Sequence, residues 1–424
     1  MQIHVVKKGE TAYSISNLYH VNLSLLLGDN GLTEDSKLVV GQALVIQFPR
    51  KTYVVQSGDT LSAIALKNNI SLDELYRNNY SLFGNPNITQ GQILVIEYEQ
   101  KKLGTFEANS YAYPYIKDEL MKKQLPYLTY LAPFTYGIQA DGSLVDLNDE
   151  QLIKLSNMYG TKKLMHLSTL TEAGNFSNDR AHLVLTNPEI QNVLIDAIIA
   201  NMKAKGYDGL DVDFEFIFPE DRYDYATFLQ NLRLRLNPLG YPVYSALAPK
   251  THDNQRGILY EGHDYSLIGA ATNKVLLMTY EWGYTYGPPM AVAPLNNVRD
   301  VVEYAVTRIS SSKMLLGIPT YGYDWTLPFV PGGNGAPSIS PVEALDLARK
   351  YNAEIEFDEI AMAPWFKYSD ENGVLHEVWF EDARSIKAKL KLAHDFGFFG
   401  IGYWNSMRDF PQNWVVLNAL YNIG

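Results

Sequence analysis

Three acidic residues alternate with apolar residues in the segment Asp208-Gly209-Leu210-Asp211-Val212-Asp213-Phe214-Glu215. Successive side chains of a β-strand point to opposite faces, so a strand here places Asp211, Asp213 and Glu215 on one face and the apolar side chains on the other. Like charges in a low-dielectric interior cannot all stay ionised, so at least one carboxyl should hold a proton near neutral pH. Such a protonated acid is what cleavage of a glycosidic bond needs.

The elements around this segment have the spacing of βα units. From about Leu103 to the end of the chain, short apolar or aromatic runs are separated by helical stretches; the runs are 104–113, 128–137, 163–170, 209–216, 243–249, 274–280, 314–321 and 399–404. Eight such units over about 320 residues predict an α/β fold, a closed (β/α)8 TIM barrel. A doubly wound sheet is the alternative that periodicity leaves open.

Glu215 comes last in its run, nearest the end of the strand that faces the active site in such barrels. We therefore expect it to be the general acid. The alternative is a solvated strand whose outer face is acidic; three carboxylates flanked by apolar residues favour the barrel interior. The gap between Tyr321 and Phe399 is too long for one helix, and it contains alternating stretches at 354–357 and 374–380. We expect a small α+β insertion at about 323–380.

The first hundred residues contain an internal repeat with a period of 49 to 50 residues. Gly9-Glu10-Thr11 matches Gly58-Asp59-Thr60, and the Gly-Gln-Ala-Leu-Val-Ile segment starting at Gly41 matches a similar segment starting at Gly91. Each unit has βααβ order, with Asn30 or Asn79 after the second helix. Residues 2 to 97 resemble paired LysM domains, which implies binding to N-acetylglucosamine-containing glycans. The predicted domains are 1–48 and 51–98, before a catalytic barrel at 103–424. Small repeats used for dimer contacts are the alternative.

The acidic segment resembles the DGxDxDxE signature of glycoside hydrolase family 18. By position, this resemblance makes Glu215 the proton donor, Asp213 the partner that orients the substrate acetamido group, and Asp211 the charge that supports Asp213. Met278-Thr279-Tyr280-Glu281 is similar to the family's MxYD motif, which makes Tyr280 a hydroxyl donor to the acetamido oxygen.

Two later motifs also resemble the family. The run Leu316-Gly317-Ile318-Pro319-Thr320-Tyr321-Gly322 is similar to its LGIPxYG strand, and Gly402-Tyr403-Trp404 is similar to its last strand, whose tryptophan lies under the sugar. The residues that we expect to bind substrate are Trp404, Met278, Glu281, Asp208 and Tyr321. Two departures from the family pattern are Glu281 in place of Asp and the segment 166–170, beginning at His166, in place of an SxGG-type strand.

The family resemblance implies a mechanism without an enzymic nucleophile, because the 2-acetamido oxygen of the substrate attacks the anomeric carbon. Configuration is retained, and the sugar that is cleaved must carry an N-acetyl group. Two LysM repeats joined to such a barrel resemble the cortical-fragment-lysing N-acetylglucosaminidases of spore-forming bacteria. This resemblance implies a hydrolase of spore cortex peptidoglycan. It also implies that the protein is located in the spore envelope and acts during germination. The alternatives are a chitinase or chitooligosaccharide hydrolase, and a non-catalytic glycan-binding coat protein.

Composition limits the other function classes. The formal net charge of −12, without a basic run, argues against nucleic acid or anionic lipid as the main partner. The chain has no cysteine, and its eight histidines form no HExxH-like pair, so we expect no metal and no cofactor. No signal peptide or membrane span is predicted from the pattern. We expect a monomer whose partner is peptidoglycan or another N-acetylglucosamine-containing glycan.

Overall fold

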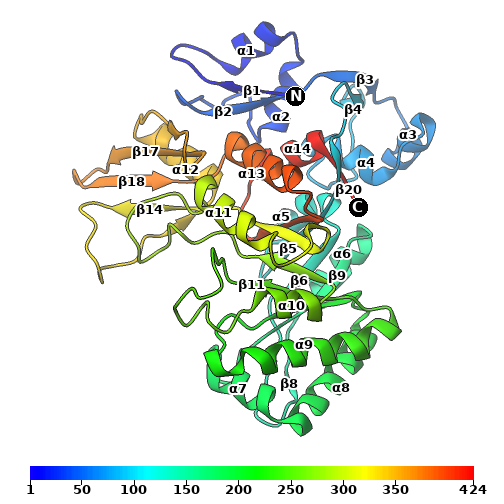
Figure 1. The fold of residues 1–424 in the computed structure, drawn as a ribbon. Coiled ribbons are helices and arrows are strands. Elements are labelled where there is room, and N and C mark those ends of the chain that lie inside the picture. Colours follow the sequence, from blue (N-terminus) through cyan, green and yellow to red (C-terminus); the bar gives the residue numbers. More distant parts are fainter.

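The computed structural model describes residues 1–424 and begins with two small βααβ units (Figure 1). The first unit contains β1 (Gln2–Val5), α1 (Ala12–Tyr19), α2 (Leu23–Asp29) and β2 (Ala43–Ile46). The second contains β3 (Pro49–Val54), α3 (Leu61–Asn68), α4 (Leu72–Arg77) and β4 (Ile93–Tyr98). In each unit the first and last strands pair antiparallel. The predicted βααβ order of both repeats is confirmed.

The repeated Gly-Glu/Asp-Thr turn starts the first helix of each unit. Gly9 and Gly58 have φ values of +86° and +85°, which glycine adopts without steric cost. The hydroxyl of Thr11 accepts a hydrogen bond from the Ser14 N–H at 3.1 Å, and that of Thr60 accepts one from the Ala63 N–H at 3.2 Å. Each threonine is thus the N-cap of its helix, which explains why the tripeptide repeats.

A buried asparagine ties the second helix of each unit to its closing strand. The Asn30 side-chain amide donates to the carbonyls of Leu26 and Val45, both at 2.9 Å, and its oxygen accepts from the Val45 N–H at 2.7 Å. Asn79 makes the same three bonds in the second unit. Three satisfied hydrogen bonds at a buried position account for the recurrence of asparagine there.

Eight parallel strands form a closed barrel in the rest of the chain. In barrel order they are β5 (Gly104–Ala112), β6 (Tyr130–Pro133), β9 (Lys162–Ser168), β10 (Gly209–Asp213), β11 (Val243–Leu247), β12 (Lys274–Leu277), β13 (Met314–Pro319) and β19 (Gly400–Trp404). Pairing between β19 and β5 closes the ring. The predicted (β/α)8 barrel is confirmed, and the doubly wound sheet is excluded because such a sheet has two free edges. A short β20 (Tyr421–Ile423) pairs with the start of β5.

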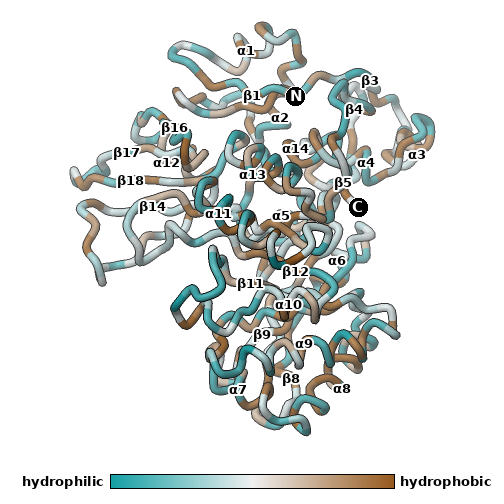
Figure 2. The backbone as a smooth tube through the Cα atoms, viewed as in Figure 1, coloured by the Kyte–Doolittle hydropathy of each residue, from teal (hydrophilic) through white to brown (hydrophobic).

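Helices surround the barrel: α5 (Asp118–Gln124), α6 (Glu150–Met158), α7 (Asn178–Thr186), α8 (Pro188–Lys205), α9 (Arg222–Leu236), α10 (Tyr265–Ala271), α11 (Leu295–Ala305), α13 (Ala383–Asp395) and α14 (Pro411–Leu420). Apolar and polar residues alternate along helices such as α13 (Figure 2), and its apolar positions Ile386, Leu390 and Ala393 are buried. This is the amphipathic pattern of a helix that covers a core. No single helix is long and apolar enough to cross a membrane; α7 and α8 meet that test only together and are bent by 102°.

A second, antiparallel sheet is inserted in the chain between β13 and α13, and it projects to one side of the barrel (Figure 1, left). Its elements are β14 (Gly322–Thr326), β15 (Ser338–Ile339), α12 (Pro341–Lys350), β16 (Glu356–Asp358), β17 (Ala363–Ser369) and β18 (Leu375–Trp379), and the strand order is β15-β14-β18-β17-β16. A small hairpin of β7 (Gly137–Ile138) and β8 (Leu144–Val145) follows β6. The five-stranded sheet extends the molecule beside the carboxyl end of β13, where it can form a wall of the active-site cleft.

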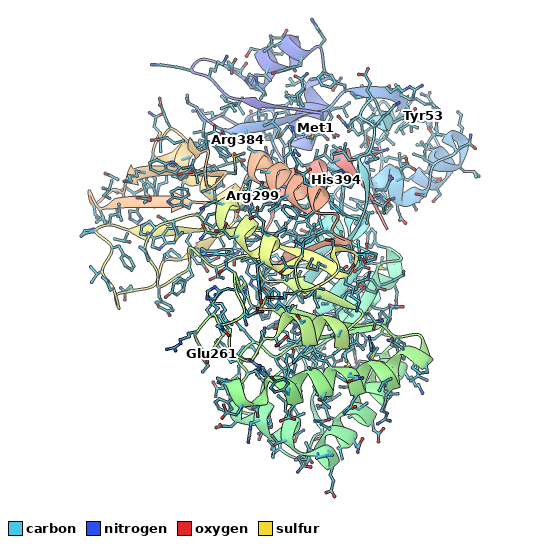
Figure 3. The ribbon with its side chains drawn as sticks, viewed as in Figure 1. Met1, Tyr53, Glu261, Arg299, Arg384 and His394 are labelled. Carbon is cyan, nitrogen blue, oxygen red and sulfur yellow. The ribbon has the colours of Figure 1, made fainter.

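Both repeats pack against the barrel. The Gln412 amide on α14 donates to Asn30 Oδ1 at 2.9 Å and to the Ala43 carbonyl at 2.7 Å, and Arg384 on α13 donates to the Gly41 carbonyl at 3.2 Å. Figure 3 shows Arg384 where α13 faces the first repeat. In the second repeat, the Asn418 amide on α14 donates to the Arg77 carbonyl at 3.0 Å. Buried and partly buried hydrogen bonds therefore hold the repeats in a defined orientation on the catalytic body.

Candidate active site

The acidic segment lies on β10, with its two faces in the predicted arrangement. Leu210, Val212 and Phe214 are completely buried, and the Phe214 ring stacks on Tyr225 of α9 with centroids 5.6 Å apart. On the other face, Asp211 is 2% exposed and accepts a hydrogen bond of 2.7 Å from the Tyr111 hydroxyl on β5. The apolar side of the strand thus anchors it to the helix layer and turns the carboxyl groups into the barrel.

The strand is shorter than its apolar run. β10 ends at Asp213, where its pairing with β9 stops, so Glu215 lies in the loop at the carboxyl end of the barrel. The predicted strand continued to Phe216; beyond Asp213 no neighbouring strand provides hydrogen-bond partners. The loop position brings Glu215 to the mouth of the barrel, where it lines the same cavity as Asp213.

That cavity, which we call the acid pocket, has a volume of about 230 Å³. Aromatic side chains make up much of its wall. Its lining residues are Tyr113, Phe134, Thr169, Phe176, Asp213, Glu215, Phe216, Met278, Tyr280, Glu281 and Trp404. The carboxyl ends of six barrel strands (β5, β6, β9, β10, β12 and β19) therefore meet here, and a sugar ring can lie on an aromatic surface beside three carboxyl groups.

Trp404 and Tyr280 reach this cavity from the ends of β19 and β12. The Trp404 indole contacts the rings of Phe134 and Tyr111, with centroids 5.0 and 5.6 Å away. Gly317 of β13 lies against Tyr280, since a Cβ atom at residue 317 would come 2.8 Å from Cε1 of Tyr280. The glycine of the Leu-Gly-Ile-Pro run therefore makes room for the tyrosine ring.

Charge repulsion and burial keep a proton on Glu215. Removal of the carboxyl from water, followed by the negative charges of Asp213 and Glu281, raises its pKa to about 7. The Tyr280 pKa is raised well above 10, first by burial and then by Asp213 and Glu215. Near neutral pH, the pocket thus offers a protonated carboxyl group and a tyrosine that remains a hydroxyl donor.

His166 on β9 is a residue of this site whose contact the sequence did not predict. It is completely buried, its Nδ1 lies 2.6 Å from the Thr135 hydroxyl, and its Nε2 lies 3.5 Å from Oδ2 of Asp213 without a hydrogen-bond partner. The imidazole edge thus lies next to the Asp213 carboxylate. The departure at residues 166–170 marked this strand as unusual, but only the register of β9 beside β10 places the imidazole under Asp213.

Glu281 has an unusual backbone conformation and firm side-chain partners. Its φ of +66° lies in the left-handed region, which is uncommon for residues other than glycine. Its carboxylate accepts hydrogen bonds from the hydroxyls of Tyr321 and Tyr323, the latter at 3.1 Å. Tyr321 therefore orients Glu281, and both line a second cavity of about 330 Å³ next to Trp404.

Asp208 does not join the other predicted residues. It precedes the first residue of β10, at the amino end of the barrel, where its carboxylate accepts from the Lys163 N–H at 2.8 Å and lies 3.5 Å from the Lys163 ammonium. Cleft residues come from the carboxyl ends of the strands, so the prediction that Asp208 binds substrate is corrected. Its contacts instead link the starts of β9 and β10.

Cleavage of a glycosidic bond is the chemistry that this cleft supports, and the chain is a glycoside hydrolase built on a (β/α)8 barrel. More specifically, it belongs to glycosyl hydrolases family 18, whose model matches residues 98–409, while the LysM domain model matches residues 4–47 and 53–97. Both predicted family relationships are confirmed.

Similar proteins extend over the whole chain. A Bacillus anthracis protein named cortical fragment-lytic enzyme is 40% identical over 429 residues, which span 100% of this chain and 99% of that relative. The crystal structure of the Bacillus cereus spore cortex-lytic enzyme SleL matches with a TM-score of 0.85 at 38% identity, over 100% of this chain and 98% of that one. A chitinase from Chromobacterium violaceum shares the fold, with 24% identity, a TM-score of 0.68 and coverage of 74% of this chain and 98% of that one.

Replacement of Glu281 by glutamine is expected to move the alkaline limb of the kcat/KM profile to lower pH. The Glu281 charge helps to raise the Glu215 pKa, so its removal lowers that pKa and reduces the protonated fraction near pH 7. The shift should be less than about one pH unit, because burial and the charge of Asp213 raise the Glu215 pKa more than the charge of Glu281 does. The measurement is kcat/KM on one soluble substrate from pH 5 to 9. Glu281→Asp keeps the charge and is the control; equal profiles for all three proteins would contradict the coupling.

Proposed function

We propose that this protein hydrolyses spore cortex peptidoglycan at β-1,4 bonds that follow N-acetylglucosamine and that it acts during spore germination. One observation carries the proposal: Glu215, with a pKa of about 7, lines the same cavity as Asp213, Tyr280 and Trp404. The full-length similarity to cortical fragment-lytic enzymes supports the choice of polymer. We assign glycan binding to residues 1–48 and 51–98 and catalysis to 103–424.

In the first step, protonated Glu215 transfers its proton to the glycosidic oxygen as the bond to the anomeric carbon breaks. The 2-acetamido oxygen of the bound sugar forms the new bond to that carbon and gives an oxazolinium ion. Asp213 accepts a hydrogen bond from the acetamido N–H, and Tyr280 donates one to the acetamido oxygen. Asp213 also stabilises the positive charge that develops on the ring.

In the second step, the Glu215 carboxylate accepts a proton from water, which attacks the anomeric carbon and releases the acetamido oxygen. Glu215 regains its proton, and the configuration of the sugar is retained. Asp211 lies next to Asp213 on the same face of β10. Its carboxyl group accepts a hydrogen bond from the Tyr111 hydroxyl, and burial is the main cause that raises its pKa. The His166 imidazole lies 3.5 Å from the Asp213 carboxylate.

The mechanism determines which sugar can lie on Trp404. A muramic lactam has no free acetamido group and therefore cannot occupy this position. We assign N-acetylglucosamine to it and a muramic residue to the leaving side of the bond. Met278, Glu281 and Tyr321 shape the cavity around the bound sugar. The similarity to spore enzymes supports a location in the spore envelope, where the repeats can keep the barrel on its polymer.

Mass spectrometry of digested cortex fragments tests the bond that is cleaved. We expect products whose new reducing ends are N-acetylglucosamine. New reducing ends on muramic residues would overturn the assignment. Comparison of the rates on intact cortex and on pre-cut fragments shows whether the enzyme needs earlier cleavage by another enzyme. The size distribution of the products over time shows whether it cuts within glycan chains or from their ends.

A further inference from the structure

A second cavity lies directly beside the acid pocket, and we call it the arginine pocket. Its volume is about 330 Å³. It shares Tyr113, Glu281 and Trp404 with the acid pocket, but Asp213, Glu215 and Tyr280 do not line it. Its lining residues are Tyr113, Tyr115, Glu281, Tyr321, Tyr323, Ser338, Trp404, Asn405, Met407 and Arg408.

The absence of Glu215 from this lining indicates which sugar the arginine pocket receives. Glu215 must lie at the bond that is cleaved, on the reducing side of the sugar that covers Trp404. A cavity that continues past Trp404 without Glu215 therefore receives the preceding sugar, on the non-reducing side. The exposed Tyr115 ring, stacked on Tyr113 with centroids 5.3 Å apart, extends the aromatic surface in that direction.

Arg408 is the one cationic residue among the residues that line the two cavities. The same residues include the carboxyl groups of Asp213, Glu215 and Glu281, and the chain as a whole carries a formal charge of −12. An anionic glycan that enters this cleft is repelled by the ionised carboxylates among them and by the net negative charge of the chain unless a cation meets it. The position of Arg408 can offset that repulsion for one substituent of the polymer.

The Arg408 guanidinium is held in place yet keeps donors available. Its Nη2 donates to the Ser338 carbonyl on β15 at 3.0 Å, and its Nη1 lies 3.8 Å from Oε2 of Glu343. That Glu343 oxygen already accepts from the Ser340 N–H at 2.6 Å as part of the cap of α12. The Arg408 side chain is 34% exposed. A guanidinium has five N–H donors in a planar fork, and a carboxylate needs only the two N–H groups of one edge, so the donors not used by Ser338 are enough to bind an anion.

We propose that Arg408 binds a carboxylate of the muramic residue that precedes the cleaved N-acetylglucosamine. The assignment rests on the proposed function, because only an alternating glycan with N-acetylglucosamine on Trp404 puts a muramic residue in the arginine pocket. Muramic residues that have not formed the lactam carry a carboxylate on the lactyl group or on the attached peptide stem, whereas chitin chains carry none. Arg408 is thus a specificity residue that favours peptidoglycan over chitin.

The test compares Arg408→Gln with the parent full-length protein on four substrates. These are cortex fragments with intact peptide stems, fragments whose stems an amidase has removed to expose the lactyl carboxylate, fragments whose carboxylates have been converted to amides, and the neutral hexamer of N-acetylglucosamine. We expect kcat/KM to fall about tenfold on at least one carboxylate-bearing substrate, mainly through KM, as for loss of a charged hydrogen bond. The substrate with the larger loss identifies the carboxylate.

Amidated fragments and the neutral hexamer should be cleaved by the variant within about twofold of the parent, since no charged contact is lost there. The parent itself should lose about tenfold when its fragments are amidated, a test that needs no mutation. Arg299→Gln is the matched control. Arg299 (Figure 3) is an exposed residue of α11 without a side-chain hydrogen bond or ion pair, so this substitution removes the same charge at a position outside the cleft.

Two kinds of failure can be separated. In the first case, the parent cleaves cortex fragments, and the ratios of kcat/KM among the stem-bearing, stem-free and amidated fragments are the same for Arg408→Gln as for the parent. The Arg408 assignment is then overturned and the proposed function stands. If the parent cleaves the neutral hexamer but no cortex fragment, the proposed function itself fails. A general loss on all four substrates would show that Arg408 acts through folding or the acid pocket, which also overturns the assignment.

Discussion

Replacement of Glu215 by glutamine is expected to lower kcat on cortex fragments by about 10³- to 10⁴-fold, the upper range for a positioned general acid. Glutamine has nearly the size of glutamate but no carboxyl proton, so the leaving oxygen departs without protonation and the water is not activated. Initial rates of reducing-end release measure the effect. Near-parental turnover by this variant would show that Glu215 is not the acid.

The control for this prediction is binding to insoluble cortex. The repeats contact the barrel through α13 and α14, and no residue of the first hundred lines the acid pocket. Glu215→Gln should therefore sediment with cortex as the parent does. Glu220→Gln, in the segment after β10 and outside both cavities, is a matched substitution that should leave kcat unchanged.

Removal of the N-acetyl group from the substrate is expected to lower turnover by at least about 10⁴-fold, because an oriented internal nucleophile corresponds to effective molarities of about 10⁵ M or more. No carboxylate of the enzyme substitutes for it: Asp213 is the partner of the acetamido group, and Glu215 serves as acid and base. Cortex fragments whose glucosamine residues have been N-deacetylated provide the test, with initial rate as the measurement.

Re-acetylation of the same fragments should restore the rate, which separates loss of the nucleophile from damage to the glycan. Hydrolysis of the deacetylated fragments at a comparable rate would instead require a nucleophile from the protein. The mechanism would then have to be rejected even if Glu215→Gln were inactive, because an acid is needed in either scheme.

Local periodicity explains why much of this site could be predicted. The two-residue alternation of a strand is enough to put Asp211 and Asp213 on one face, with Glu215 next in line. The threonine caps of the repeats are equally local, since each joins residues three apart. Asp208 was misplaced although the chain order that puts Glu215 at the carboxyl end of the strand puts Asp208, the first residue of the segment, at the opposite end.

Contacts between distant parts of the chain depended on the tertiary structure. His166 lies below Asp213 because β9 and β10 are neighbours in register, and Arg408 faces the cleft because the loop after β19 meets β15 of the second sheet. Likewise, Gln412 holds Asn30 only because α14 packs on the first repeat.

The sequence by itself thus determined the βα units, the two repeats and the acidic strand, because the signal of each element lies within a few residues, whereas the pairing of β19 with β5 decided that the sheet closes into a barrel. The closed barrel decided which charges surround Glu215, and so its pKa of about 7, because electrostatic effects depend on distances in space.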